Sequence, residues 1–364
     1  MGRGAAIGGK QAAILDSGRL RAWFRDAFGD CRVPLQDDRL LRPGQRTKHS
    51  LERSRIGDRL ARHRGSAAFR QGPEGSAARQ CRGFPMNPHA AQPTSLLAFA
   101  HSLWRHRLLI RQMTRREVIG RYQGSFLGLG WSFLNPLLML CVYTFVFSVV
   151  FKARWGVAPE GGEESRSMFA IVLFVGMIVH TLFAEILNRA PGLIIGNVNY
   201  VKKVVFPLEI LPVVSTGAAL FHALVSLMVW LLAYWLFIGT PDWQVLLFPV
   251  VMLPLVVLAL GLAWFLASLG VFLRDVGQTV TIVTTIMMFL APVFFPVDSL
   301  PEEFRPLIMA NPITFIIEQA RGVLIRGQLP DFVGLFWYFA AASIVMWAGF
   351  AWFQKTRKGF SDVL

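Results

Sequence analysis

Long apolar runs dominate the chain after residue 95. Six of them are long enough to cross the hydrocarbon core of a membrane, which takes about 20 helical residues. They cover residues 129–151, 168–187, 208–238, 243–272, 279–297 and 333–353. None has the strict alternation of apolar and polar residues that is typical of a transmembrane β-barrel. The pattern therefore predicts an all-α membrane protein with six transmembrane helices.

The third and fourth runs are longer than a straight crossing requires. The third contains Pro212, and the fourth contains Pro249 and Pro254. Proline removes a backbone donor and kinks a helix when it lies inside one. We therefore expect part of each run to be kinked or to lie in the membrane interface.

A basic amphipathic segment, residues 96–122, precedes the first run. Arg107, Arg111 and Arg115 recur every four residues and form one basic stripe, whereas the apolar residues lie mainly on other faces. This pattern is typical of a helix lying in the membrane interface with its basic side toward anionic headgroups. An ordinary cytoplasmic amphipathic helix would look similar. Both interpretations place the segment at the cytoplasmic surface.

Charge divides the chain into two parts. The 364 residues carry 37 Lys and Arg against 22 Asp and Glu, a formal net charge of +15, and 54% of the residues are hydrophobic. Residues 1–95 account for +10 of this charge and residues 96–364 for +5. Near the ends of the apolar runs, 13 Lys and Arg lie on the side that holds both termini and 6 on the other. The positive-inside rule therefore predicts that both termini are cytoplasmic.

The basic head, residues 1–95, is predicted to be disordered or weakly ordered because its middle holds few large aliphatic side chains. Residues 4–11 approach a phosphate-binding P-loop, but Gln11 stands where a hydroxyl must bind magnesium, and no strand can precede the loop. Three explanations of the head remain open: a nucleic-acid arm, a targeting peptide, or translated sequence upstream of a true start at Met86. The lack of a nucleic-acid-binding signature and of a cleavable apolar stretch favours the third.

The chain shows no catalytic or metal-binding pattern. Its three cysteines are widely spaced, and no Cys/His spacing suggests zinc. Titratable residues in or beside the runs are few, and they include Glu185, Glu209, His180 and His222. For each histidine a packed, hydrogen-bonded role is favoured over one facing a cavity. The absence of a chain of acids and histidines argues against a proton- or sodium-driven carrier, and the absence of a selectivity-filter motif or an arginine row argues against potassium and voltage-gated channels.

The apolar runs are unusually aromatic. Lipid anchoring and packing account for most of these side chains. For Tyr143, Phe147, Phe289 and Phe294 a second interpretation is that they line a pathway on which sugar rings stack, because aromatic faces meet the apolar faces of sugars with little penalty. Both interpretations remain open for these four residues.

One motif resembles a known family. From Arg121 to Pro136 the chain reads R-Y-x-x-S-x-L-G-x-x-W-x-x-x-x-P. This run closely resembles the ABC-2 family of permeases, and more narrowly the branch that exports O-antigen, capsule and teichoic acid. Residues 199–212 resemble the cytoplasmic segment after the family's second span, and residues 311–327 its signature before the last span. The resemblance covers about residues 96–364, and the basic head has no counterpart in it.

The resemblance implies a half-transporter of the bacterial inner membrane. Two copies of the permease pair with two copies of a separate ABC ATPase, which binds ATP and magnesium. The permease itself has no catalytic residues and binds no cofactor, metal or nucleic acid. The implied cargo is a lipid-linked polysaccharide. An exporter of a drug or small lipid, and a scaffolding membrane protein without transport, are the alternatives.

The resemblance also assigns residues to the ATPase contact. The segment after the second span is a coupling helix in the family, and a shorter turn makes a second contact. The residues at these positions are Lys202, Lys203, Phe206, Pro207, Glu209, Arg274 and Asp275. A positively charged inside loop without a partner would also account for the two lysines, and Arg274 and Asp275 would then simply be solvated.

Two further sites follow from the resemblance. Arg115, Arg116 and Arg121 are candidates for binding the diphosphate of the lipid carrier, since arginine matches phosphate geometry. Residues 298–330 are expected to form short re-entrant helices that close the outer end of the pathway. The match there is carried by Asn311, Pro312, Glu318 and Arg321.

Two spacings predict local contacts. Glu318 and Arg321 are three residues apart and can pair on one helical face, which a purely structural salt bridge would explain equally well. Gly124 and Gly128 form a GxxxG pattern, which is expected to allow close packing of helices.

Overall fold

The computed structural model describes residues 96–150, 166–202 and 206–364. Contacts divide the chain into Met1–Gly83 and Phe84–Leu364, and all described residues belong to the second unit. The predictions for the basic head and for a start at Met86 lie outside the described residues. Every element in the described ranges is helical, which confirms the all-α prediction for this part of the chain.

Five of the predicted spans are confirmed as helices that are long and apolar enough to cross a membrane, so the chain is a multi-pass membrane protein. The first is α6 (Gly130–Tyr143), which continues as the π-helix η2 (Thr144–Val150). The others are α7 (Arg166–Arg189), α10 (Ile210–Phe237), η3 (Trp243–Leu247) with α11 (Phe248–Phe272), and α15 (Phe332–Thr356).

The fifth predicted span, residues 279–297, is shorter than expected. Helix α12 (Val276–Phe289) has 14 residues and ends eight residues before the predicted boundary at residue 297. Residues 290–295 are turns and bends. Pro292 lies in this stretch and Pro296 directly follows it, and proline cannot continue the hydrogen-bond ladder of a helix. At 1.5 Å per residue α12 is about 21 Å long, which is short of the full hydrocarbon core.

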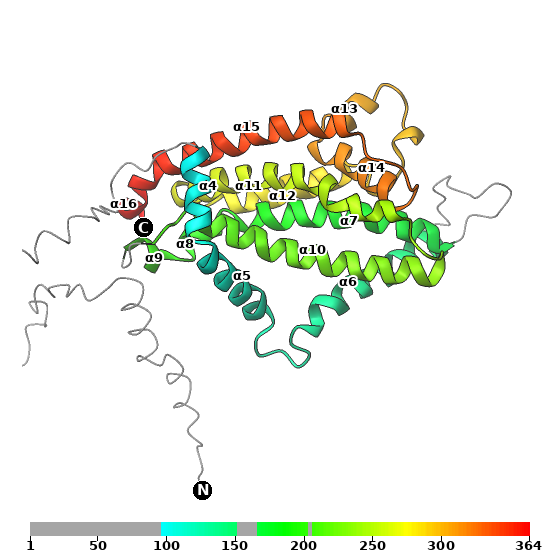
Figure 1. The fold of residues 1–364 in the computed structure, drawn as a ribbon, viewed down its shortest axis with the longest axis horizontal. Helices are drawn as coiled ribbons and strands as arrows, with labels where there is room; N and C mark the ends of the chain where they lie inside the picture. Colours follow the sequence, from blue (N-terminus) through cyan, green and yellow to red (C-terminus); the bar gives the residue numbers. More distant parts are fainter. Residues whose placement is uncertain (1–95, 151–165, 203–205) are drawn as a thin grey trace, which may run out of the picture. The chain divides into compact units, whose positions relative to one another are not determined.

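Helix α7 lies at the centre of the bundle and contacts α10, α11, α12, α14 and η2 (Figure 1). Within their most apolar windows, 78% of α7 is buried but only 6% of the span Gly130–Phe147. The apolar core cluster draws on α7, α10, α11 and α14. Helix α6 therefore lies at the periphery of this chain, where its apolar side chains face outward.

Close helix contacts in the bundle depend on glycine. Helix α11 packs along α15, and a Cβ at Gly349 would lie 2.0 Å from the carbonyl oxygen of Gly261. A Cβ at Gly261 would in turn lie 2.5 Å from the Cα of Met346. Because lipid tails are as apolar as the side chains, close van der Waals packing of small residues holds membrane helices together.

Short helices gather at the two ends of the bundle (Figure 1). One end, here called the α16 end, holds α8 (Gly192–Ile195), α9 (Val198–Lys202), η5 (Arg357–Gly359) and α16 (Phe360–Val363). The other, the α14 end, holds η4 (Val297–Ser299), α13 (Arg305–Met309) and α14 (Pro312–Leu324). The short helices predicted between the fifth and sixth runs are thus present.

The segment before the first span forms two helices, α4 (Leu96–Arg105) and α5 (Arg107–Tyr122), separated at His106. The three arginines of the basic stripe lie on α5 and are exposed. The GxxxG interpretation of Gly124 and Gly128 is wrong. Both lie in the turns between α5 and α6 with φ of 87° and 52°, and a Cβ at either would meet nothing within 4 Å. These glycines supply left-handed backbone, and they pack against no helix in the part of the chain that the structure describes.

Candidate functional site

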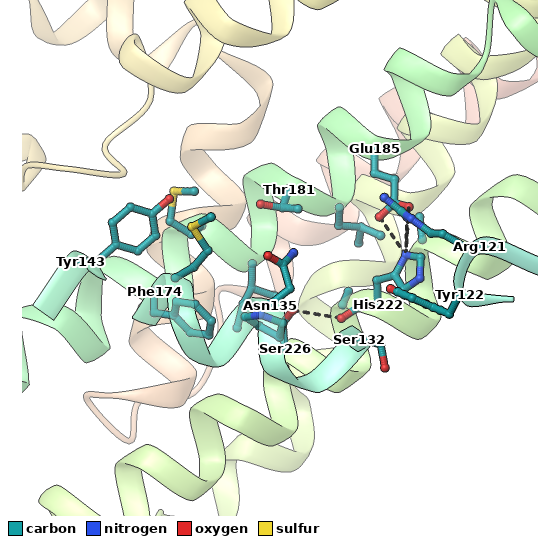
Figure 2. A pocket seen from close by; sticks show the side chains of 17 residues that line it. Arg121, Tyr122, Ser132, Asn135, Tyr143, Phe174, Thr181, Glu185, His222 and Ser226 are labelled. Atoms are coloured by element: carbon teal, nitrogen blue, oxygen red, sulfur yellow. Dashed lines mark hydrogen bonds and ion pairs between the residues drawn. The ribbon is translucent and has the colours of Figure 1, made fainter. Parts of the chain in front are cut away.

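A polar cavity of about 160 Å³ opens between α6, α7 and α10 beside the end of α5 (Figure 2). Its apolar walls include Phe174, Met177 and Leu182. Polar side chains from all four helices line the rest: Arg121, Tyr122, Ser132, Asn135, Thr181, Glu185, His222 and Ser226. A cavity with this many hydroxyl, amide and charged groups inside an apolar bundle suits a polar guest.

Glu185 is the centre of an ion cluster at one side of this cavity. Its Oε1 lies 2.5 Å from Arg121 Nη1 and 2.9 Å from His222 Nδ1. Arg189, one turn further along α7, lies 3.7 Å from the same oxygen. In Figure 2 the side chains of Arg121 and His222 point toward the carboxylate from α5 and α10. The cluster therefore joins α5, α7 and α10 at one side of the cavity.

The surroundings of this cluster are only partly exposed. The Glu185 side chain is 12% exposed, and His222 Nε2 is buried without a hydrogen-bond partner among the described residues. The rings of Tyr122 and His222 meet edge to face with centroids 6.0 Å apart. Burial raises the pKa of the Tyr122 phenol, so it stays a protonated donor at neutral pH.

A second cavity, of about 560 Å³, is lined by residues of α5, α7, α8, α9 and α10. Arg189 forms an ion pair with Glu117 there and also approaches Glu185, so the ion network extends from one cavity to the other. The polar lining of the second cavity consists of Arg116, Glu117, Asn188, Arg189, Asn197 and Tyr200.

The three predicted headgroup arginines are separated by this arrangement. Arg121 lines the first cavity and Arg116 the second, whereas Arg115 lines neither. Arg121 is engaged by Glu185. Arg115 and Arg116 are exposed and form no ion pair with any residue that the structure describes. An anion at Arg121 must therefore compete with the Glu185 carboxylate, whereas at Arg115 and Arg116 it meets no such competitor.

The four aromatic residues predicted to line a pathway form a continuous row. Tyr143 lies at the far end of the first cavity from Arg121 (Figure 2). Its ring centroid is 6.5 Å from that of Phe147, which stacks on Phe294 at 5.6 Å. Phe294 in turn stacks on Phe289 at 5.9 Å. The aromatic row is defined as Tyr143, Phe147, Phe294 and Phe289, and the polar cavity leads directly to it.

One further aromatic residue beside this row was not predicted from the sequence. Phe169 of α7 stacks on Phe147 at 5.8 Å and is 4% exposed. It anchors the aromatic row to the buried central helix. The pairing joins the start of the second span to the end of the first across residues 151–165, so periodicity within one run does not reveal it.

The α14 end is organised by Asn311 and Pro312. Asn311 caps α14 by accepting from the Ile313 amide at 3.2 Å, and its side-chain amide donates to the Met287 carbonyl at 3.0 Å. The carbonyl of Pro312 accepts from the Tyr338 hydroxyl at 2.8 Å. These two residues thereby fix α14 to α12 and α15.

The predicted pair between Glu318 and Arg321 is confirmed at 3.0 Å. Arg321 is 1% exposed, and its Nη2 also donates to the carbonyl of Val293 at 3.1 Å. Burial lowers the pKa of Arg321 to about 10, the Glu318 carboxylate opposes this shift, and the guanidinium stays charged at neutral pH. A Cβ at Gly176 of α7 would lie 3.1 Å from Arg321 Nη2, so this glycine makes room for the guanidinium.

The predicted ATPase-contact residues fall into different environments. Lys203 lies outside the described residues, whereas Lys202, Arg274 and Asp275 are exposed at or near the α16 end. Glu209 is only 7% exposed, and its carboxylate pairs with Arg357 at 2.9 Å. The partner of Glu209 therefore lies in this chain, 148 residues away along the sequence. No local sequence pattern indicated this contact.

The remaining predictions concern the histidines and metals. His180 is buried, and its Nε2 lies 3.0 Å from the Thr284 carbonyl, which confirms the packed role. His222 instead lines the first cavity while pairing with Glu185. Among the described residues no group of three or more His, Cys, Asp or Glu is placed to hold a metal ion.

Several curated proteins are similar to this chain. The O-antigen export system permease protein RfbA of Myxococcus xanthus is 29% identical over 269 residues, which span 73% of this chain and 99% of that protein. An O-antigen export system permease protein RfbA of Klebsiella pneumoniae is 25% identical over 261 residues, 70% of this chain and 95% of the relative. The polysialic acid transport protein KpsM of Escherichia coli is 21% identical over 259 residues, 69% and 94% of the two chains.

The family model described as ABC-2 type transporter matches residues 109–325, more than half of the chain. The match runs from α5 to the end of α14 and includes the polar cavity, the aromatic row and the Glu318–Arg321 pair. Together with the bundle of membrane-spanning helices, it shows that this chain belongs to the ABC-2 type transporter family.

Proposed function

We propose that this chain is the permease subunit of an ATP-driven exporter that carries a lipid-linked, O-antigen-like polysaccharide across the bacterial inner membrane. The observation that carries the proposal is the continuity between the polar cavity and the aromatic row. Sugars expose hydroxyls at their edges and C–H groups on their faces, and this lining offers partners for both. The relatives named for export of O-antigen and transport of polysialic acid support the same class of cargo.

The anionic diphosphate of the carrier lipid is proposed to bind first at α5. Arg115 and Arg116 are exposed there, and arginine binds phosphate through two parallel hydrogen bonds. Arg121 is proposed to follow as a second contact, which requires the diphosphate to replace Glu185 as its partner. The glycan then passes along the aromatic row toward the α14 end, where Asn311, Pro312, Glu318 and Arg321 form the outer gate.

An exporter of a drug or small lipid is the alternative cargo class. Such a carrier is expected to hold its substrate in a predominantly apolar cavity. The presence of Asn135, Ser132, Thr181 and Ser226 beside the ion cluster favours a glycan instead.

ATP hydrolysis is proposed to take place in a separate ABC ATPase that docks at the α16 end. The exposed side chain of Lys202, the adjacent Lys203 and the turn at Arg274 and Asp275 are the proposed contacts. Two copies of the permease would form the pathway, as the family resemblance implies, and the outward-facing apolar surface of α6 supports a second copy beside this one. The α16 end, with its lysines and arginines, is proposed to be cytoplasmic.

The cargo is tested by deleting the gene in its native host. Surface polysaccharide is expected to disappear while lipid-linked glycan accumulates on the cytoplasmic side, and the wild-type gene on a plasmid should reverse both effects. Unchanged surface polysaccharide after deletion would contradict the proposal.

The ATPase contact is tested by copurification. The double variant K202E/K203E is expected to lose its ATPase because charge reversal replaces attraction by repulsion at the contact. The matched control is K355E/K358E, which reverses two exposed charges at the same end. Retention of the ATPase by the first variant would exclude the two lysines as the docking contact.

A further inference from the structure

Arg357 lies just past the last span and outside the residues that the ABC-2 family model matches. It is the first residue of η5, directly after α15 ends at Thr356. Its Nη1 lies 2.9 Å from Glu209 Oε2, and its Nη2 donates to the carbonyl of Phe206 at 3.0 Å. One guanidinium therefore binds both ends of residues 206–209, the stretch that connects the proposed ATPase contact to α10.

This connecting stretch is fixed by further contacts to two other helices. The second carboxylate oxygen of Glu209 accepts from Ser102 of α4 at 3.3 Å. The backbone carbonyl of Glu209 accepts from the indole of Trp264, a fully buried side chain of α11, at 3.0 Å. Residues 206–209 thus contact α4, α11 and the end of α15 at the point where α10 begins.

Apolar packing supports the same junction. The ring of Phe206 stacks on Tyr200 of α9 with centroids 4.5 Å apart and an interplanar angle of 15°. Phe360 of α16 is fully buried and meets Phe353 of α15. Phe353 and Phe360 belong to one buried cluster with Ile194, Leu208 and Trp264, and the partly buried rings of Tyr200 and Phe206 pack against this cluster. The C-terminal residues therefore pack against the connecting stretch and are not a free tail.

The ion pair between Arg357 and Glu209 is largely shielded from water. The side chains of Arg357 and Glu209 are 14% and 9% exposed. Charge-assisted hydrogen bonds are shorter and stronger than neutral ones, and loss of one partner of a shielded pair leaves the other charge buried without compensation.

We infer that Arg357 is a positioning residue for energy transfer, which ties the stretch between the ATPase contact and α10 to the last span. A displacement of α9 by the motor then moves α10 and α15 together, because the guanidinium holds Phe206 and Glu209 against the end of α15. This role rests on the proposed function, and it predicts that the loss of Arg357 uncouples ATP hydrolysis from export.

The test uses the full-length permease coexpressed with its ATPase and reconstituted in vesicles. Three quantities are measured: the amount of ATPase that copurifies, ATP hydrolysis, and glycan exported per ATP hydrolysed. R357M is expected to retain its ATPase and its hydrolysis but to export about tenfold less glycan per ATP. R357K keeps the charge but not the two-pronged geometry, so it should fall between R357M and the wild type.

K358M is the matched control, because it removes the neighbouring positive charge from an exposed side chain and should behave like the wild type. E209Q removes the other half of the ion pair and should reproduce the R357M result. Equal export per ATP in R357M and the wild type would overturn the inference. A second outcome would also overturn the inference. In it, R357M loses folded permease, copurified ATPase and export in parallel, while R357K and E209Q export as much glycan per ATP as the wild type. Arg357 would then have a role in folding only. Failure of the proposed function is distinguishable, because the wild-type chain itself would then copurify with no ATPase.

Discussion

Arg321 shows how a single charge is accommodated inside this bundle. Its guanidinium is 1% exposed and binds the Glu318 carboxylate and the Val293 carbonyl. Charged groups at membrane depth are expensive unless they are paired. The pairing explains why this arginine is tolerated at the α14 end, where it fixes the turn after α12.

Replacement of Arg321 by methionine is therefore expected to destabilise the protein by about 3 kcal/mol, because the Glu318 and Val293 oxygens lose a buried partner. The matched control is R326M, which removes the other partner of Glu318 from a side chain that is 43% exposed. Exposed pairs contribute about 1 kcal/mol or less. Thermal unfolding of the purified variants in detergent measures the loss of stability in R321M and in R326M. Equal losses in the two variants would contradict the argument that burial makes the Arg321 pair the more important one.

Gly349 allows the close approach of α15 to α11. A Cβ there would lie 2.0 Å from the carbonyl of Gly261, so G349A should push α15 away from α11. We expect a loss of about 2 kcal/mol, as for other overpacked positions. G120A is the control, because a Cβ at Gly120 in α5 meets nothing within 4 Å, and its melting temperature should be unchanged or higher. A lower melting temperature for G120A than for G349A would refute the packing argument.

Contacts between charged side chains could be predicted from the sequence only where both residues lie on the same helix. The spacing of Glu318 and Arg321 was sufficient to predict their contact. The contacts of Glu185 with Arg121 and His222 cross 64 and 37 residues, and helical periodicity contains no information about such separations. The partners of Glu209 were missed for the same reason.

Among the elements, the aromatic row yields the sharpest functional prediction. The variant F147A breaks the row at its centre, because Phe147 is in ring contact with both Tyr143 and Phe294. We expect the initial rate of surface glycan appearance to fall about thirtyfold, given about 1 kcal/mol for each of these two ring contacts. F145A is the control, since Phe145 lies in the same π-helix but is 60% exposed. If both variants export at the wild-type rate, the row is not part of the pathway.

The long helices were predictable because each is a continuous apolar run with few charges. The end of α12 at Phe289 was harder to predict from the sequence, because the apolar run continues through Phe294 and Phe295. Hydrophobicity alone does not distinguish a helix from a turn that neighbouring helices bury, and Val293 in this turn is fully buried. The prolines at 292 and 296 were the available signal for the boundary.

For the whole molecule, the proposed topology places the α14 end outside and the α16 end in the cytoplasm. Ser299 at the α14 end and Asp362 at the α16 end are both exposed. In a background with Cys31, Cys81 and Cys141 changed to serine, S299C is expected to react with a membrane-impermeant maleimide in intact spheroplasts. D362C should react only after the membrane is permeabilised. Labelling of both cysteines in intact spheroplasts would contradict the cytoplasmic placement of the C-terminus and the crossing by α15, which lies between the two positions.

The buried site of Arg321 also has a consequence for synthesis. Gly176 and Val293, which shape that site, precede Arg321 in the chain and leave the ribosome first. The arginine therefore reaches the membrane after its surroundings have been made, and Glu318 arrives with it on the same helical turn. Because of this order of synthesis, the Arg321 side chain does not have to remain unpaired in the lipid. In a circularly permuted gene that begins at residue 298, Arg321 would be synthesised before Gly176 and Val293, the residues that shape its site.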